Sequence, residues 1–300
     1  MELIYRLAKL SLVEIEDHLS QTTPAIEALH PDHISPMAVS PNNPPWSAPA
    51  AFGVWVASVL FILIVPTFFL LPYLATLKPP ITDPEQIIEF AKTDAVAVFL
   101  QIVAILPAHL LTFAVVWLVA SHGRQYKISQ TLGFEKGGFK WWHYVVILVG
   151  FFITAAVVGN YFPEQDNDLL RILKSSRTAV YIVAFVATFT APAIEEFVYR
   201  GILYSAFQRA LGMPAAFVIV TLMFALVHVP QYYPSYSTIF LLTLLSVILT
   251  LIRVKANNLL PCIVLHTLFN GFQSVLLILE PYLPETSVPD PSAALLHLIK

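Results

Sequence analysis

The sequence predicts an all-α fold, a polytopic integral membrane bundle of about 7–8 transmembrane helices. Of its 300 residues, 57% are hydrophobic and 12% are charged, and the mean hydropathy is +0.74. Soluble domains average about a quarter charged residues, so this balance indicates a membrane protein. The formal net charge of -3 lacks the positive excess of nucleic-acid-binding proteins, and we expect no nucleic-acid partner.

Residues 1–50 differ in composition from the rest of the chain. Residues 3–15 show the spacing of a short amphipathic helix, and residues 31–49 are rich in Pro, Ser and Asn. We therefore expect an amphipathic segment followed by a Pro-rich linker that is irregular or disordered. Residues 51–285 are predicted to form one membrane-embedded domain, and residues 286–300 a C-terminal tail.

Seven apolar segments approach the roughly 20 residues that a helix needs to cross a bilayer. They are Phe52–Leu77, Ala95–Ser121, His143–Phe162, Ala179–Arg209, Pro214–Val229, Ser237–Val254 and Asn258–Leu279. Pro66 and Pro72 are expected to kink the first segment, because proline lacks an N–H and clashes with the preceding turn. The fourth segment is too long for one simple span, and we expect it to divide near Pro192 or to become interfacial after Gly201.

The fourth apolar segment contains Glu195, Glu196 and Arg200, a cluster of charges at membrane depth. Charged side chains inside a bilayer are costly, and they usually face a protein interior or a functional water-filled cavity. Glu196 and Arg200 share a helix face because they lie four residues apart, whereas Glu195 points about 100° away from Glu196. We therefore expect one glutamate to pair with Arg200 and the other to face a reaction cavity.

Two later apolar segments each carry a histidine at a similar depth. Phe224 and His228 lie four residues apart on one predicted helix, as do His266 and Asn270 on another. At a rise of about 1.5 Å per residue, Glu195 and His228 both lie ~21 Å from the turn between their helices. The three predicted helices are thus able to bring these polar groups to one level.

These residue types suit the hydrolysis of an amide bond. A carboxylate can act as a general base toward water, and a histidine can share that task or protonate the leaving amine. Asn270 or a second imidazole can donate hydrogen bonds to the oxyanion of a tetrahedral intermediate. Arg200 is expected to hold one glutamate ionised and in position.

In this order, the three motifs resemble the motif set of the CPBP intramembrane proteases. They read Glu195-Glu196-x-x-x-Arg200-Gly201, Phe224-x-x-x-His228 and His266-x-x-x-Asn270. That family includes type II CAAX prenyl endopeptidases, bacteriocin-processing or immunity proteins and abortive-infection-like proteins. The resemblance covers Thr178–Leu279, and Tyr199 stands where many members carry Phe.

The resemblance implies a set of catalytic residues. They are Glu195, Glu196, Arg200, His228, His266 and Asn270. It implies that Glu195 is the water-activating base and that Glu196 and Arg200 support it. It also implies that the first histidine assists catalysis, while the second histidine and the asparagine complete the site and stabilise the oxyanion.

The sequence leaves the need for a metal open. Glu195, His228 and His266 would be a legitimate three-ligand set for zinc, which is the cofactor to be considered. Against a metal, no His-Glu-x-x-His motif occurs, and Arg200 near the glutamates would compete with a cation. The resemblance does not decide between these alternatives, because the family has been described both as metal-dependent and as metal-free.

Each motif also has a structural interpretation when it is taken alone. Glu196 with Arg200 fits an intrahelical ion pair, and polar side chains often link membrane helices. Cys262, the single cysteine of the chain, lies one turn before His266 and is interpreted as a small buried residue rather than a thiol nucleophile. His109 in the second span has no nearby partner in sequence and is interpreted as structural.

Taken together, the motifs predict an intramembrane endopeptidase that hydrolyses a peptide bond with glutamate- and histidine-activated water. The expected partners are the lipid bilayer and a peptide or membrane-anchored protein substrate, which is CAAX-like if the host prenylates proteins. The expected location is the plasma membrane. The alternative is a non-catalytic membrane transporter, or an immunity or scaffold protein, whose buried charges form an ion relay or a structural pair. The oligomeric state is not predicted.

Overall fold

The structure is a computed structural model that describes residues 38–175 and 177–282 of the chain. The helices described below belong to the unit that begins at Val39. The predicted amphipathic segment at residues 3–15 and the predicted tail at residues 286–300 lie outside the described residues. Within the described residues that unit is all-α and contains no β-strand, as predicted.

Within the described ranges, seven helices are long and apolar enough to cross a membrane, which confirms the predicted polytopic bundle. They are α2 (Ala48–Leu74), α4 (Ala95–Ala120), α5 (Trp141–Tyr161), the composite helix Arg177–Leu211, α10 (Met213–Tyr232), α11 (Tyr236–Ala256) and α12 (Leu260–Leu279). Short helices that were not predicted lie between or after these spans. They are α3 (Pro84–Thr93), η2 (Ser129–Gly133), α6 (Asp168–Ser175) and η5 (Glu280–Tyr282).

Side-chain caps fix where the first helices begin. Ser47 accepts a hydrogen bond from a backbone N–H in the first turn of α2, and Asp83 does the same for α3. Asp94 caps α4 by accepting from the N–H groups of Val96 and Ala97. Such caps satisfy N–H groups that have no partner within the helix. The prolines of α2, Pro66 and Pro72, lie inside one continuous helix.

The fourth span is one composite helix of 35 residues, so it does not divide near Pro192, and it continues past Gly201. Its parts are α7 (Arg177–Phe185), the π-helical η3 (Val186–Thr190), α8 (Ala191–Glu196), the π-helical η4 (Phe197–Leu203) and α9 (Tyr204–Leu211). Pro192 lies in the first turn of α8, directly after η3, and has no N–H to donate to the preceding turn. The charged cluster therefore lies between and within π-helical segments, which are frequent at functional sites.

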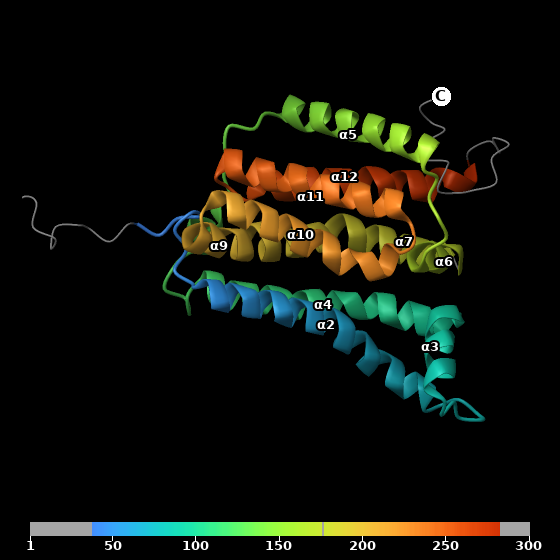
Figure 1. Ribbon diagram of the computed structural model, residues 1–300. Coiled ribbons are helices and arrows are strands. Elements are labelled where there is room, and N and C mark those ends of the chain that lie inside the picture. The colour runs from blue at the N-terminus through green and yellow to red at the C-terminus, as the bar shows by residue number, and fades with distance from the viewer. Residues whose placement is uncertain (1–37, 176, 283–300) are drawn as a thin grey trace, which may run out of the picture. The chain divides into compact units, whose positions relative to one another are not determined.

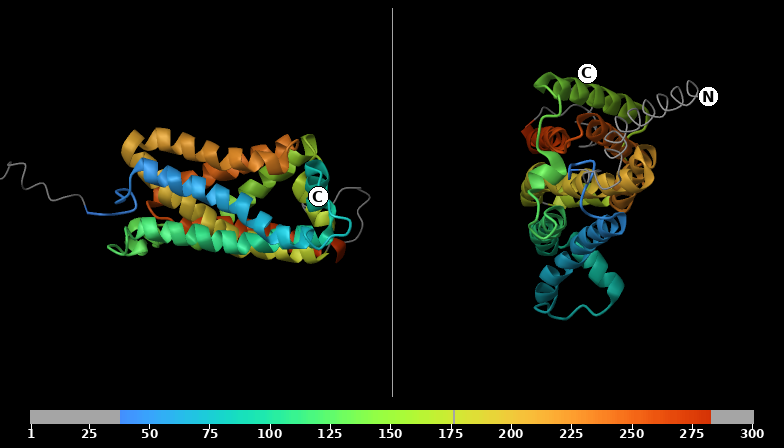
Figure 2. Two further views of the ribbon diagram at one scale, coloured as in Figure 1. Left: turned by 90° about the horizontal axis from the view of Figure 1, so that it is seen from below. Right: turned by 90° about the vertical axis from the view of Figure 1, so that its left-hand side faces the viewer.

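The helices pack on two sides of the composite helix. On one side α2 packs along α4, and both contact η4. On the other side α12 contacts α7, η3 and α8, while α10 packs along α11, and α5 contacts α11 and α12. Figure 1 shows this order, with α2 and α4 below the composite helix and α5 outermost above α11 and α12. Figure 2 shows the same helices from two further directions.

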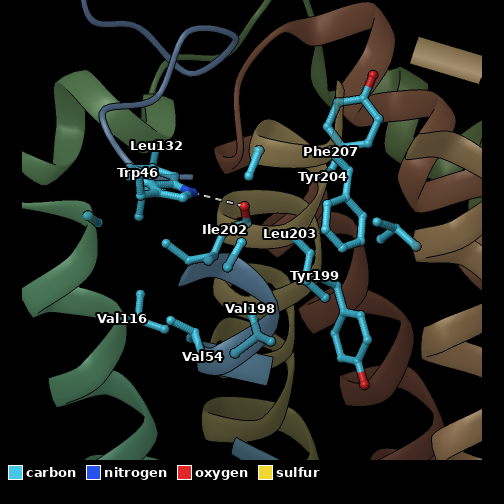
Figure 3. Close-up of a cluster of buried hydrophobic side chains, with 14 of the residues drawn as sticks. Trp46, Val54, Val116, Leu132, Val198, Tyr199, Ile202, Leu203, Tyr204 and Phe207 are labelled. Atoms are coloured by element: carbon cyan, nitrogen blue, oxygen red, sulfur yellow. Dashed lines mark hydrogen bonds between the residues drawn. The ribbon is translucent and has the colours of Figure 1, made fainter. Parts of the chain in front are cut away.

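A cluster of buried apolar side chains surrounds η4 and fixes its position (Figure 3). Val54 of α2, Val116 of α4 and Leu132 of η2 all belong to it. Gly201 is a point of close packing on η4, because a Cβ atom there would lie 3.2 Å from Leu132 Cδ2 and 3.3 Å from Leu259 Cδ2. A larger residue at this position would require these leucine side chains to shift.

Residues 39–47 form an N-terminal strap that packs against η4 and α9. Trp46 is 3% exposed, and its Nε1 donates to the carbonyl oxygen of Ile202 at 3.1 Å (Figure 3). Arg209 donates to the carbonyl oxygens of Pro44 and Trp46. The described part of the predicted linker is therefore irregular but ordered, and the predicted domain boundary at residue 51 falls inside α2.

Candidate active site

The two adjacent glutamates at the end of α8 have different surroundings. Glu196 is fully buried in the bundle, whereas the side chain of Glu195 is 25% exposed and borders a cavity. Successive helical residues point about 100° apart, which separates the two carboxylates. Glu195 is therefore the glutamate that a substrate in the cavity can contact.

Arg200 neutralises Glu196 inside the bundle. Its Nη1 donates to Glu196 Oε1 at 3.0 Å, and neither side chain has exposed surface. Its Nη2 donates to Oγ and to the carbonyl oxygen of Ser246, at 2.8 and 3.0 Å, and its Nε donates to Thr250 Oγ1 at 3.3 Å. The guanidinium also lies over Phe224, 4.6 Å from the ring centroid. Because a desolvated ion pair needs such additional hydrogen bonds, this network fixes the position of both charges.

His266 connects the buried ion pair to the cavity. Its Nδ1 lies 2.9 Å from Glu196 Oε1, the oxygen that Arg200 also binds. Since Glu196 Oε1 already accepts a hydrogen bond from Arg200, it acts as an acceptor here too, and Nδ1 carries the hydrogen. The other nitrogen, Nε2, then lies 3.8 Å from Glu195 Oε2. A buried carboxylate thus orients an imidazole toward Glu195, in the way that the aspartate of a hydrolase triad orients its histidine.

His228 is oriented by its own helix. Its Nδ1 lies 2.7 Å from the carbonyl oxygen of Phe224, one turn earlier in α10. A carbonyl oxygen only accepts, so Nδ1 carries the hydrogen, and in the neutral imidazole Nε2 presents a lone pair. The Phe224 ring contacts both imidazoles, with centroid distances of 4.8 Å to His228 and 6.0 Å to His266. The structure therefore brings the predicted histidine-bearing helices together at one level.

Asn270 follows His266 by one turn of α12. Its Nδ2 donates to the carbonyl oxygen of Ala187 in η3, at 2.8 Å. An amide nitrogen carries two hydrogens, so one remains for a ligand. Asn270 borders the same cavity as the glutamate and histidines, and its position is consistent with a hydrogen-bond donor to a substrate.

Glu195, His228, His266 and Asn270 border a single cavity of about 920 Å³. Its wall is mostly apolar, and residues from α2, α4, α5 and the later helices contribute to it. The cavity extends to Glu280, at the C-terminal end of α12. Its size lies within the roughly 300–1,000 Å³ of ligand pockets, so it has room for several residues of a substrate chain.

The residues placed at the site do not assemble a metal centre. Among the described residues, no three histidine, cysteine, aspartate or glutamate side chains come close enough together to hold an ion. The zinc ligands considered from the sequence were Glu195, His228 and His266. Among the described contacts, the pair within this set is His266 Nε2 and Glu195 Oε2, which lie 3.8 Å apart. Glu196, the other glutamate, is already paired with the positive charge of Arg200.

Cys262 does not belong to the site. It is fully buried, and its Sγ donates to the carbonyl oxygen of Leu249 at 3.4 Å. It packs in an apolar cluster with residues such as Leu245 and Phe269. Its interpretation as a small buried residue is confirmed.

The residues that hold Arg200 were missed from the sequence. Ser246 and Thr250 of α11 are both fully buried. Ser246 Oγ donates to the carbonyl oxygen of Thr221 in α10 at 3.3 Å, and Thr221 Oγ1 donates to Thr250 Oγ1 at 3.4 Å. The sequence did contain one signal for them. Two hydroxyl side chains lie four residues apart in an apolar span, and residues at this spacing share one helix face.

Comparison with known proteins identifies the part of the chain that contains this site. Residues 177–272 match the family model described as Rce1-like, type II CAAX prenyl endopeptidase Rce1-like. The match begins with α7, ends within α12 and contains all six candidate site residues. It confirms the resemblance to the CPBP intramembrane proteases, and the seven apolar spans are those of an integral membrane protein. No curated protein and no solved structure matches the chain.

Proposed function

We propose that the protein is an intramembrane endopeptidase that cleaves a peptide bond in a membrane-associated or CAAX-like peptide or protein. The observation that carries the proposal is the position of Glu195, which faces the cavity 3.8 Å from Nε2 of His266. The buried pair of Glu196 and Arg200 orients that imidazole. The Rce1-like match supports the reaction class.

Glu195 is the proposed general base. A water molecule at its carboxylate gives up one proton to it, and the water oxygen attacks the carbonyl carbon of the scissile bond. The π electron pair of the carbonyl moves to oxygen and forms a tetrahedral intermediate. When the intermediate collapses, the C–N bond breaks, and the leaving nitrogen takes the proton that Glu195 and His266 have held. The products are a carboxylic acid and an amine.

Asn270 and His228 are proposed to bind the reacting amide. The remaining Nδ2 hydrogen of Asn270 donates to the oxygen that becomes negative in the intermediate. The free lone pair at Nε2 of His228 accepts a hydrogen bond from the scissile N–H. Both interactions orient the peptide bond toward the water on Glu195. Each of these residues borders the cavity, which is a requirement of the proposal.

Purified full-length protein in lipid nanodiscs provides the test. It is incubated with a library of membrane-associated peptides, among them CAAX-like peptides with and without a prenyl group, and products are identified by mass spectrometry. We expect cleavage of at least one class, and Glu195→Gln should reduce the rate about 10²- to 10⁴-fold. Glu135→Gln, at an exposed glutamate outside the cavity, is the matched control and should leave the rate unchanged.

The results separate the proposal from its alternative. Cleavage that persists in Glu195→Gln would remove Glu195 as the base. The absence of cleavage by wild-type protein, together with Glu195-dependent ion flux in liposomes, would favour the transporter. The prenylated and unprenylated arms of the library decide whether the substrate class includes CAAX proteins. Fractionation of host membranes would test the proposed plasma-membrane location.

A further inference from the structure

His109 of α4 borders the same cavity as Glu195, although its sequence context predicted a structural role. Its side chain is 7% exposed, so nearly all of its surface is buried. α4 contacts both η3 and α8, the segments that immediately precede and contain Glu195. His109 also lies close enough to Glu195 to interact with its carboxylate electrostatically. The fold thus adds an imidazole from the second span to the candidate active site.

The hydrogen bonds around His109 determine which ring nitrogen carries the hydrogen. Nδ1 lies 2.9 Å from Thr190 Oγ1. The Thr190 hydroxyl donates its own hydrogen to the carbonyl oxygen of Val186 at 3.2 Å, so it accepts from Nδ1. In the neutral imidazole, Nε2 therefore has no hydrogen and presents a lone pair.

The Nε2 atom of His109 opens onto the cavity. Among the described residues it makes no hydrogen bond, since the His109 ring bonds through Nδ1. In the same residues, Glu196 Oε2 is the one buried side-chain nitrogen or oxygen atom without a hydrogen-bond partner. Because Nε2 has no partner and is not such a buried atom, it retains accessible surface, and the cavity is the space that the ring borders.

We propose that His109 is a further active-site residue, whose Nε2 accepts a hydrogen bond from the water that Glu195 activates. This inference rests on the proposed protease function. A water molecule has two hydrogens, and Glu195 removes one of them. If His109 binds the other, which stays on the oxygen throughout the attack, the lone pair of the water is directed at the scissile carbonyl. Such orientation lowers the barrier because the nucleophile is held in its reactive geometry.

Chemical labelling tests the placement of His109 without reference to activity. Diethyl pyrocarbonate transfers an ethoxycarbonyl group to an imidazole nitrogen that has a free, accessible lone pair, and peptide mass spectrometry locates the product. We expect modification of His109 in the folded wild-type protein. Thr190→Val removes the hydroxyl that accepts from Nδ1 and fixes the tautomer. The rate at which His109 is labelled in this variant should therefore differ from the wild-type rate. Lack of labelling at His109 while His228 is modified would overturn the proposal.

Kinetics test the role. His109→Phe keeps an aromatic ring but removes the acceptor, and it should lower kcat about 10- to 100-fold with little change in KM. His109→Gln supplies another acceptor and should recover part of kcat. A purely structural role would instead lower the melting temperature and change KM and kcat together. His143→Phe is the matched control, since His143 lies at the start of α5 and does not border the cavity.

The outcomes distinguish this inference from the function on which it rests. Active wild-type protein together with fully active His109→Phe would overturn the role of His109 and leave the protease function intact. Labelling of His109 in a wild-type protein that cleaves no substrate and shows Glu195-dependent ion flux would overturn the protease function, and the catalytic role of His109 with it. The inference requires three results: accessible Nε2, a selective loss of kcat and partial recovery by glutamine.

Discussion

Nδ1 of His266 donates to Oε1 of Glu196 across 2.9 Å, and this oxygen also binds Nη1 of Arg200 at 3.0 Å. One carboxylate oxygen therefore has two roles: it neutralises a buried cation and it orients an imidazole. Glu195 has neither role, since it borders the cavity and lies 3.8 Å from Nε2 of that imidazole. Adjacent glutamates should consequently respond to mutation in different ways.

Glu196→Gln should lower both the thermal stability and the activity of the protein, whereas Glu195→Gln should lower the activity alone. The first substitution leaves Arg200 charged and uncompensated in the bundle, a change that typically costs about 3–5 kcal/mol. The second removes a carboxylate from a partly exposed position. Thermal unfolding in detergent, followed by tryptophan fluorescence, measures the difference. Equal melting temperatures for the two variants would show that the ion pair does not stabilise the fold.

Arg200→Lys should be far from conservative. A lysine ammonium cannot reproduce the planar fork that binds Glu196, Ser246 and Thr250 at once. Each buried partner that is left without a hydrogen bond costs about 1–3 kcal/mol. We expect a lower melting temperature and a lower kcat. KM should change less, because Arg200 does not border the cavity.

Arg124→Lys provides the control for that substitution. Arg124 lies in the exposed turn after α4, where its guanidinium lies over Trp117, 5.4 Å from the ring centroid. Its replacement should leave both the melting temperature and kcat near the wild-type values. If Arg200→Lys behaved like Arg124→Lys, the hydrogen-bond geometry around Arg200 would not matter for the site.

The spans were predictable because hydropathy averaged over about 20 residues is a strong signal that does not depend on contacts. The π-helical segments η3 and η4 were not predictable from the sequence. A π-helical turn changes the pattern of backbone hydrogen bonds, and distant side chains here bind two carbonyl groups of η4. Trp46 donates to the carbonyl oxygen of Ile202, and Arg253 to that of Arg200. Local sequence cannot report partners that lie so far away in the chain.

The same distinction applies to the candidate site. The four-residue spacings in the motifs placed Glu196 with Arg200, as the helical period requires. The spacings said nothing about which oxygen binds which nitrogen, and His266 pairs with Glu196 at the closer distance rather than with Glu195. His109 was interpreted as structural with no partner in sequence, because its partner, Thr190, lies on another helix. Contacts between helices depend on packing, which no single span encodes.

Metal chelators should leave peptidase activity unchanged. The described residues contain no three-ligand cluster of histidine, cysteine, aspartate or glutamate, and the imidazole of His266 is oriented by its hydrogen bond to the carboxylate of Glu196. Activity is measured after dialysis against EDTA and 1,10-phenanthroline, and again after zinc is added back. Loss of activity that zinc restores, with metal found in the active sample by mass spectrometry, would contradict the glutamate-and-histidine mechanism.

The N-terminal strap is held by Arg253. Its Nη2 donates to the carbonyl oxygen of Pro41 at 2.7 Å and to Ser205 Oγ at 3.1 Å, and its Nη1 donates to Asn42 Oδ1 at 3.0 Å. Its Nε donates to the carbonyl oxygen of Arg200 at 3.2 Å. A single guanidinium therefore ties the strap to the backbone of the residue that neutralises Glu196.

Arg253→Gln should release the Pro41–Asn42 part of the strap and loosen η4. Several buried acceptors lose their donor, at about 1–3 kcal/mol for each that stays unsatisfied. We expect faster proteolytic cleavage within residues 39–47, a lower melting temperature and a lower kcat, because the carbonyl group of Arg200 is no longer held. Lys255→Gln, two residues further along α11 at an exposed position, removes a charge without touching the strap and should change none of these. Faster cleavage of the strap at unchanged kcat would show that the strap is anchored to the catalytic helix without controlling its geometry.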